Sequence, residues 1–194
     1  MKIKYYLFVI FFSILFLSCS SSKSSIELQN EYLPLAVGNK WFYNDNSSTE
    51  IISVDTIEGE KYFKTKIDKN ITNKSHYFYY QRISNDTLYK LNYNEKYGEY
   101  SEKITAIFNL NFGDTAKIEL PRTNLTLKYE AEGIPTGRKY SIIAVNKSED
   151  TIEFLTKTGG TDSEIYSTYK KGVGLIKTKN SWGVVLKLKD YYLN

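Results

Sequence analysis

Short runs in which every second side chain is apolar, separated by turn-forming residues, are the feature that most constrains how this chain can fold. Residues 125–131, "LTLKYEA", and residues 184–189, "VVLKLK", both show this alternation. A period of two places one face of a strand in the core and the other in solvent, as in antiparallel sheets. Turn-forming Gly, Asn, Asp or Ser residues separate such runs at residues 57–61, 84–87, 146–151 and 179–183. The sequence therefore predicts about ten antiparallel strands joined by hairpins.

A meander of this length cannot stay flat, because the twist between neighbouring strands accumulates. We therefore predict a mainly β fold in which one meandering antiparallel sheet curls into a half-barrel or a barrel, with a β-sandwich as the alternative. The 18 tyrosines and 10 phenylalanines among 194 residues favour such a fold, since aromatic side chains suit a pleated, half-buried surface. The apolar face expected to point inward includes Leu125, Leu127, Tyr129, Ile152, Phe154, Val184, Leu186 and Leu188.

The first residues of the chain have the composition of a signal peptide rather than of a strand. Lys2 and Lys4 form a positively charged start, and residues 7–17 form an apolar stretch that is too short for a comfortable membrane span. Residues 17–20, "LSCS", follow it and contain the one cysteine of the chain, Cys19. A chain with a single cysteine has no disulfide partner for it, so another use of this thiol is expected.

Residues 17–20 resemble the bacterial lipobox, with small Ser18 before the cysteine and polar serines after it. The resemblance implies that the signal is cut before Cys19, that its thiol carries a diacylglyceryl group and that the new amine is acylated. Several acyl chains would hold a protein stably on a membrane, which one chain alone does not. The alternative is a plain signal peptide or an N-terminal membrane anchor, in which Cys19 has no role.

The domain organisation expected from this resemblance is a lipoprotein signal peptide at residues 1–18, a flexible serine-rich tether at 19–31 and a single β domain at 32–194. Ser20 is not the aspartate that marks retention at the inner membrane in the enterobacterial sorting pattern, which by resemblance predicts the outer membrane. The tether also lacks the acidic cluster of surface-exported lipoproteins of Bacteroidota. We therefore expect the periplasmic face rather than the cell surface.

Three stretches together resemble uncharacterised secreted and lipid-anchored β-rich proteins of Bacteroidota. They are "EYLPLAVGNKWFYN" at residues 31–44, "FNLNFGDTAKI" at 108–118 and "YKKGVGLIKTK" at 169–179. The resemblance implies a compartment and a β fold but no activity. In the first stretch, Trp41 and Tyr43 fall on one face of a strand and are predicted to point into the core. In the last, Gly172 and Gly174 predict a bulge or a close backbone approach.

The inventory of reactive side chains excludes several classes of function. With one histidine, His76, and one cysteine, the chain lacks the residues for a His/Cys metal site or a Cys-His nucleophile, so we expect no cofactor and no metal. The net charge of +4 falls to +2 without Lys2 and Lys4, which gives no electrostatic reason to expect nucleic acid as a partner. Carboxylates are numerous but fall in turns and on polar strand faces, so enzyme activity is not our expectation.

Four Asp-Thr-apolar triplets resemble the acceptor motif of the general O-glycosylation system of Bacteroidota. The candidate threonines are Thr56, Thr87, Thr115 and Thr151. The structural alternative is that the aspartate caps a turn through its side chain and the threonine begins a strand.

Three functions of different classes remain for an envelope lipoprotein whose membrane partner is reached through the lipid. The first is a module that binds a small lipid or saccharide in the hollow of the curled sheet, which requires a pocket of a few hundred cubic ångströms. The second is a structural or assembly protein that docks envelope proteins, favoured by a completely filled hollow. The third is a hydrolase, which requires two carboxylates facing one cleft. The sequence alone identifies neither the ligand nor the partner.

Overall fold

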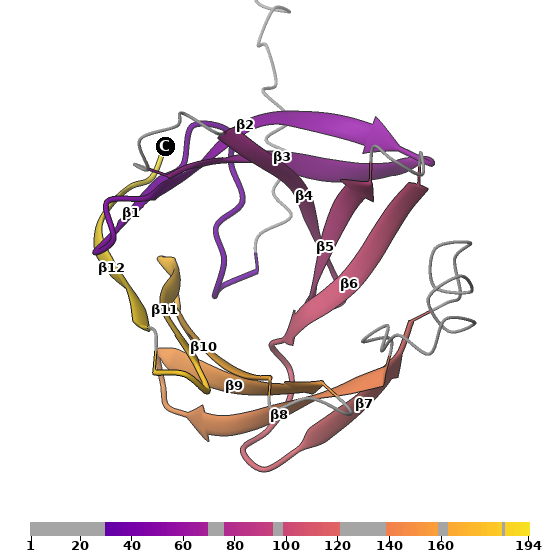
Figure 1. Cartoon of the computed structure of the whole chain (residues 1–194), viewed down its shortest axis with the longest axis vertical. Helices are drawn as coiled ribbons and strands as arrows, with labels where there is room; N and C mark the ends of the chain where they lie inside the picture. Colours follow the sequence, from indigo (N-terminus) through magenta and orange to yellow (C-terminus); the bar gives the residue numbers. More distant parts are fainter. Residues whose placement is uncertain (1–29, 70–75, 95–98, 121–138, 159–162, 184) are drawn as a thin grey trace, which may run out of the picture.

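Twelve strands form the fold in a computed structural model that describes residues 30–69, 76–94, 99–120, 139–158, 163–183 and 185–194 (Figure 1). The strands are β1 (Lys40–Tyr43), β2 (Ser48–Ile57), β3 (Glu60–Asp68), β4 (His76–Ser84), β5 (Thr87–Asn94), β6 (Glu99–Ile107), β7 (Thr115–Glu119), β8 (Lys139–Lys147), β9 (Thr151–Thr158), β10 (Glu164–Lys170), β11 (Gly174–Asn180) and β12 (Val185–Tyr192). The expected number of about ten was low, because strands such as β5 carry apolar side chains on both faces and so lack a clean alternation.

All twelve strands belong to one antiparallel sheet, in the order β6-β5-β4-β3-β2-β1-β12-β11-β10-β9-β8-β7. The predicted meander curled toward a barrel is thus confirmed, and the alternative of a two-sheet sandwich is wrong. Pairing of β1 with β12, with Trp41 opposite Tyr191, joins the first strand to the last. The two sheet edges, β6 and β7, are therefore consecutive strands from the middle of the chain.

The sheet nearly closes into a barrel where β6 approaches β8 (Figure 1). Tyr140 on β8 bridges this seam, because its hydroxyl donates to the Ile104 carbonyl oxygen on β6 and accepts from the Ile104 amide, both at 2.9 Å. One side chain thus satisfies the donor and the acceptor that the edge strand would otherwise leave unpaired. Burial raises the pKa of Tyr140 to about 12, so the hydroxyl keeps its proton at neutral pH.

The connections between strands alternate between the two ends of the barrel, since every neighbouring pair is antiparallel. We call the end that carries the β2–β3, β4–β5, β6–β7, β8–β9 and β10–β11 connections the closed end. The opposite end, with the β1–β2, β3–β4, β5–β6, β9–β10 and β11–β12 connections, is the open end.

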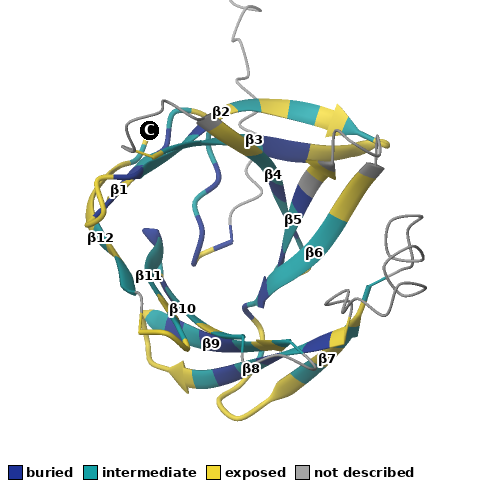
Figure 2. Ribbon diagram, viewed as in Figure 1, coloured by how far each residue is buried: buried dark blue, intermediate teal, exposed yellow. Residues whose placement is uncertain are grey.

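Residues 30–36, which precede β1, run inside the ring of strands from the closed end (Figures 1 and 2). Asn30 donates through Nδ2 to Asp86 Oδ1 in the β4–β5 turn at 2.8 Å, and the Gly172 amide donates to the Glu31 carbonyl oxygen at 2.6 Å. Tyr32, Leu33 and Leu35 are buried. Asn30 and Glu31, expected at the end of the tether, therefore contact the barrel.

An aromatic cluster at the closed end packs around this segment. The ring of Phe108 stacks on Tyr32 at 5.4 Å between centroids and meets Tyr169 edge-on at 5.2 Å and Phe154 at 5.9 Å. Offset and edge-to-face contacts of this kind add to the stabilisation from burial. The core is thus built from the inner faces of the strands together with the segment that enters the barrel.

The face predicted to point inward is confirmed where it is described. Ile152 and Phe154 are fully buried, and Leu186 and Leu188 are partly buried against the core. Trp41 and Tyr43 are buried as predicted. The remaining members, Leu125, Leu127, Tyr129 and Val184, lie outside the described residues.

Candidate functional site

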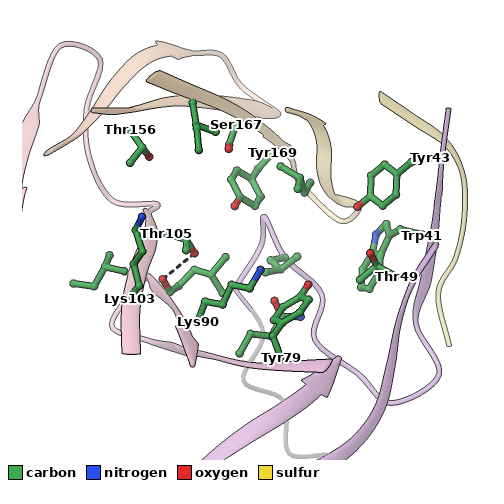
Figure 3. Close-up of a pocket in the computed structure, with 16 residues that line it drawn as sticks. Trp41, Tyr43, Thr49, Tyr79, Lys90, Lys103, Thr105, Thr156, Ser167 and Tyr169 are labelled. Atoms are coloured by element: carbon green, nitrogen blue, oxygen red, sulfur yellow. Dashed lines mark hydrogen bonds between the residues drawn. The ribbon is translucent and has the colours of Figure 1, made fainter. Parts of the chain in front are cut away.

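A cavity of about 210 Å³ lies inside the barrel (Figure 3), and Leu33 of the N-terminal segment is one of its lining residues. Side chains from opposite walls line it, which places it within the ring of strands. Thr49, Tyr79, Thr156 and Ile165 belong to the halves of their strands next to the open-end connections. Leu88, Thr105 and Leu175 belong to the halves next to the closed-end connections, so the cavity extends from the middle of the barrel toward the open end, and it is only partly enclosed.

Four aromatic side chains from β1, β4 and β10 line the cavity, and we refer to them together as the aromatic wall. The members are Trp41, Tyr43, Tyr79 and Tyr169. Trp41 is held in place because its Nε1 donates to the Val173 carbonyl oxygen at 2.6 Å, at the start of β11. Burial raises the pKa of Tyr43 to about 12 and also raises the pKa of Tyr79 and Tyr169. These phenols are therefore neutral donors at physiological pH.

The rest of the lining combines aliphatic and neutral polar groups. The aliphatic residues are Leu33, Leu88, Ile104, Ile165 and Leu175, and the polar ones are Thr49, Gln81, Thr105, Thr156 and Ser167. Some of these polar groups already have partners, since Gln81 Nε2 donates to Thr65 Oγ1 at 3.1 Å and Thr105 Oγ1 to the Leu88 carbonyl oxygen at 3.2 Å. A wall that mixes apolar surface with a few polar groups is typical of small-molecule sites.

Two lysines are the charged residues of the lining, Lys90 on β5 and Lys103 on β6. Figure 3 shows the Lys90 side chain reaching toward the cavity beside Tyr79, whose ring centroid lies 3.7 Å from Nζ. Lys103 Nζ lies 4.8 Å from the ring centroid of Tyr140. Burial lowers the pKa of both lysines, and the charge of Lys103 lowers that of Lys90 further.

The described lining contains no Asp, Glu, His or Cys. The carboxylate pair that the hydrolase hypothesis requires is therefore not found among the described residues that line this cavity. Within the described ranges, no group of three or more His, Cys, Asp and Glu side chains could hold a metal ion.

A larger hollow of about 660 Å³ lies against β7, β8 and β9, beside Ile118 and Tyr140. It is more open than the interior cavity, and two of its lining residues, Glu119 and Lys139, flank residues 120–138, most of which the structure does not describe. We therefore take the interior cavity as the candidate site.

The site residues predicted from the sequence lie elsewhere. Cys19 is outside the described residues. Thr56 and Thr115 are exposed and Thr87 and Thr151 half-buried, and all four lie next to closed-end connections. Thr87, Thr115 and Thr151 each begin a strand, and Asp114 Oδ2 accepts from the Asn111 amide at 2.9 Å, as the turn-capping alternative predicts. Glycosylation at these threonines stays a prediction.

Sequence reasoning did not single out Lys90 and Lys103. In "TLYKLNYN", both strand faces carry apolar residues, so the alternation does not show that Lys90 shares the inner face with Leu88. A register shift between Leu88 and Tyr89 also makes it harder to predict from the sequence which residues of β6 point inward. A signal was present nonetheless, because Lys90 stands two residues after a buried leucine.

The fold and the cavity define a class: a one-sheet antiparallel β-barrel with one end plugged by its own N-terminal segment. No protein-family model matches the chain, and no curated protein matches it. Among solved structures it is similar to a "putative lipoprotein" from Parabacteroides distasonis ATCC 8503, with 12% sequence identity, a TM-score of 0.39, and coverage of 84% of this chain and 100% of that chain. A similarity at this level identifies neither a site nor an activity. Within the described residues, no helix is long and apolar enough to cross a membrane.

Proposed function

We propose that this chain is an envelope lipoprotein whose barrel binds a small ligand in the interior cavity. The observation that carries the proposal is the unfilled space of about 210 Å³ between the aromatic wall and the two lysines. The scaffold alternative was favoured by a completely filled hollow, and the plug formed by residues 30–36 fills only the closed end.

The dimensions of the cavity limit the ligand to a small one. An engineered protein cavity of about 150 Å³ holds a benzene molecule, so the cavity here accommodates one six-membered ring or a short alkyl chain. The aromatic ring of Trp41 suits a sugar or an aromatic ring, and the hydroxyl group of Ser167 also lines the cavity.

The described residues that follow the proposed anchor, Asn30 and Glu31, lie at the closed end of the barrel. Asn30 and Glu31 are held by turns of the closed end, so a lipid on Cys19 would tether that end to the membrane. The cavity then opens away from the membrane. For a protein on the periplasmic face of the outer membrane, this orientation favours a ligand taken from the periplasm over a lipid drawn directly from the bilayer.

The binding proposal is tested with a cavity-filling variant and a matched control. Ser167 points into the cavity, whereas its neighbour Thr168 on β10 points outward, where its Oγ1 donates to Glu153 Oε1 at 3.2 Å. The test ligands are benzyl alcohol, 1-hexanol and glucose, together with the corresponding acids benzoate, hexanoate and glucuronate. We expect at least one of them to give saturation-transfer NMR signals and to raise the melting temperature of the wild type and of Thr168→Phe. Ser167→Phe should lose both signals. Failure of all ligands to bind, or equal binding to Ser167→Phe, would contradict the proposal.

The proposed anchor has a separate test in cells. Cys19→Ala should abolish incorporation of a labelled fatty acid, because the thiol is the proposed attachment point. Label retained in the Cys19→Ala protein at the mature size would show that the assignment is wrong. The intact mass of the native protein then also decides whether Thr56, Thr87, Thr115 or Thr151 carries a glycan.

A further inference from the structure

Lys90 and Lys103 are direct cross-strand partners in the β5–β6 pair, and both line the interior cavity. Directly opposite residues on one face of an antiparallel pair have Cβ atoms about 4.5–5.5 Å apart, and like charges in such positions destabilise a sheet. Two lysine side chains thus leave neighbouring positions on the wall of a partly enclosed space, and both line it. A barrel that served only as a scaffold gains nothing from this arrangement.

Neither ammonium group has an acidic partner among the described residues. Their recorded neighbours are the rings of Tyr79 and Tyr140. Several lysines outside the cavity do have such partners, since Lys40 pairs with Glu50 and Lys157 with Glu164, each at 2.9 Å. Among the described residues, no carboxylate pairs with either of the two lysines that line the cavity.

An unpaired charge that is withdrawn from water is costly unless an opposite charge or a hydrogen bond compensates it. Contact with an aromatic face compensates an ammonium group only in part. An acidic group of a ligand, placed between Lys90 and Lys103, would supply the missing negative charge through charge-assisted hydrogen bonds. Tyr79, whose ring contacts Lys90, lines the same space.

We propose that the ligand of this cavity is a small organic acid, whose carboxylate is bound by the Lys90 and Lys103 ammonium groups while its apolar or ring portion packs against the aromatic wall. This inference rests on the proposed function and specifies the chemical class of the ligand. The lysines act as binding residues, and no covalent step is involved.

The test compares acids with neutral molecules of nearly the same shape. Three pairs are used: benzoate with benzyl alcohol, hexanoate with 1-hexanol, and glucuronate with glucose. For at least one pair, the wild type should bind the acid about tenfold more tightly than the neutral molecule, which is the size of one charge-assisted interaction. Isothermal titration or ligand-detected NMR measures the dissociation constants.

Three variants assign the selectivity to the lysine pair. Lys90→Met and Lys103→Met should each weaken binding of the acid about tenfold more than binding of the neutral molecule, so that the preference for the acid is lost. Lys64→Met is the matched control, because Lys64 lies on the outer face with its Nζ 5.2 Å from the ring centroid of Phe78. It should bind like the wild type. A melting curve for each variant establishes that it is folded before binding is compared.

The outcomes separate this inference from the proposed function. Equal binding of acids and neutral molecules, or selectivity that survives in both Lys90→Met and Lys103→Met, would overturn the assignment of an acidic ligand while leaving a binding cavity. Absence of binding by all six molecules would contradict both. Acid selectivity that is lost in the two inner variants and kept in Lys64→Met would establish the lysine pair as the site of the acidic group.

Discussion

The closed and open ends of this barrel both consist of connections between antiparallel strands, yet their interiors differ in composition and in packing. At the closed end, Tyr32, Phe108 and Phe154 fill the space between the strands. From the middle of the barrel toward the open end, Lys90, Thr156 and Ser167 border an unfilled cavity. The difference arises because the segment before β1 enters only one end. One end of the barrel therefore supplies much of the stability, and the other retains space for a ligand.

This division predicts that truncations at the two ends differ in their effect on the free energy of unfolding. Phe108→Ala removes the ring at the centre of the aromatic cluster and should cost about 3–5 kcal/mol, the usual effect of deleting a buried phenyl ring. Ile165→Ala, at the rim of the cavity and 40% exposed, should cost less than about 1 kcal/mol. Chemical denaturation measures both. Similar losses at the two ends would contradict the comparison.

A glycine at the closed end tests how tightly the N-terminal segment is packed. Gly174 has φ +103°, and a Cβ there would lie 3.0 Å from Leu33 Cδ1 and 3.2 Å from Trp41 Nε1. Gly174→Ala should therefore cost about 2–3 kcal/mol, from backbone strain and from displacement of these side chains. Gly172 is the control, because its φ is +68° and nothing lies within 4 Å of its Cβ position. Gly172→Ala should cost about 1 kcal/mol, and an equal loss at both positions would show that the segment is loosely packed.

The seam between β6 and β8 should depend on one hydroxyl group. Tyr140→Phe removes the bridge to the Ile104 amide and carbonyl oxygen and should cost about 1–2 kcal/mol, because these backbone groups lose their partner. Hydrogen exchange of the Ile104 amide should also become faster. Tyr166→Phe is the control, since that hydroxyl donates to a side chain, Glu164 Oε2 at 3.5 Å, and not to the backbone of an edge strand. An unchanged Ile104 exchange rate in Tyr140→Phe would mean that the seam is held by other contacts.

The smallest expected effect is at the open end and has the opposite sign. Burial and the neighbouring Lys103 lower the pKa of Lys90 in the folded protein, so its charged form destabilises the fold at neutral pH. Lys90→Met should therefore raise the free energy of unfolding by about 1 kcal/mol, or the melting temperature by about 2–4 °C. As the pH rises from the lowered pKa toward the usual lysine value, the wild type loses this charge on folding and becomes relatively more stable.

The difference in free energy of unfolding between Lys90→Met and the wild type should accordingly become smaller as the pH rises. The other titratable groups facing this cavity are Tyr43, Tyr79, Tyr169 and Lys103. The phenols stay protonated over most of this range because burial raises their pKa values. Melting curves from pH 7 to pH 10 measure the trend, with Lys64→Met as the control. A stability difference that grows with pH would contradict the proposed origin of the effect.

Local pattern was sufficient for much of the fold. The period-two alternation and the turn residues predicted an antiparallel meander, because both are properties of a few neighbouring residues. They also placed Trp41, Tyr43, Ile152 and Phe154 on the inner face, where these side chains are buried. At Gly174, the predicted close backbone approach is to Leu33 and Trp41.

Contacts between distant parts of the chain determine the position of the cavity and the side chains that line it. Three features depend on how far the sheet curls and on which surfaces then meet. They are the pairing of β1 with β12, the entry of residues 30–36 into one end of the barrel, and the alignment of Lys90 with Lys103 beyond the register shift at Leu88 and Tyr89. Alternation states that a strand has two faces, but it does not state which distant side chain each face will contact. The sequence by itself determined the strands and their core faces, while the plugged end and the lysine-lined cavity were decided by tertiary packing, because only closure of the sheet brings these groups around one enclosed space.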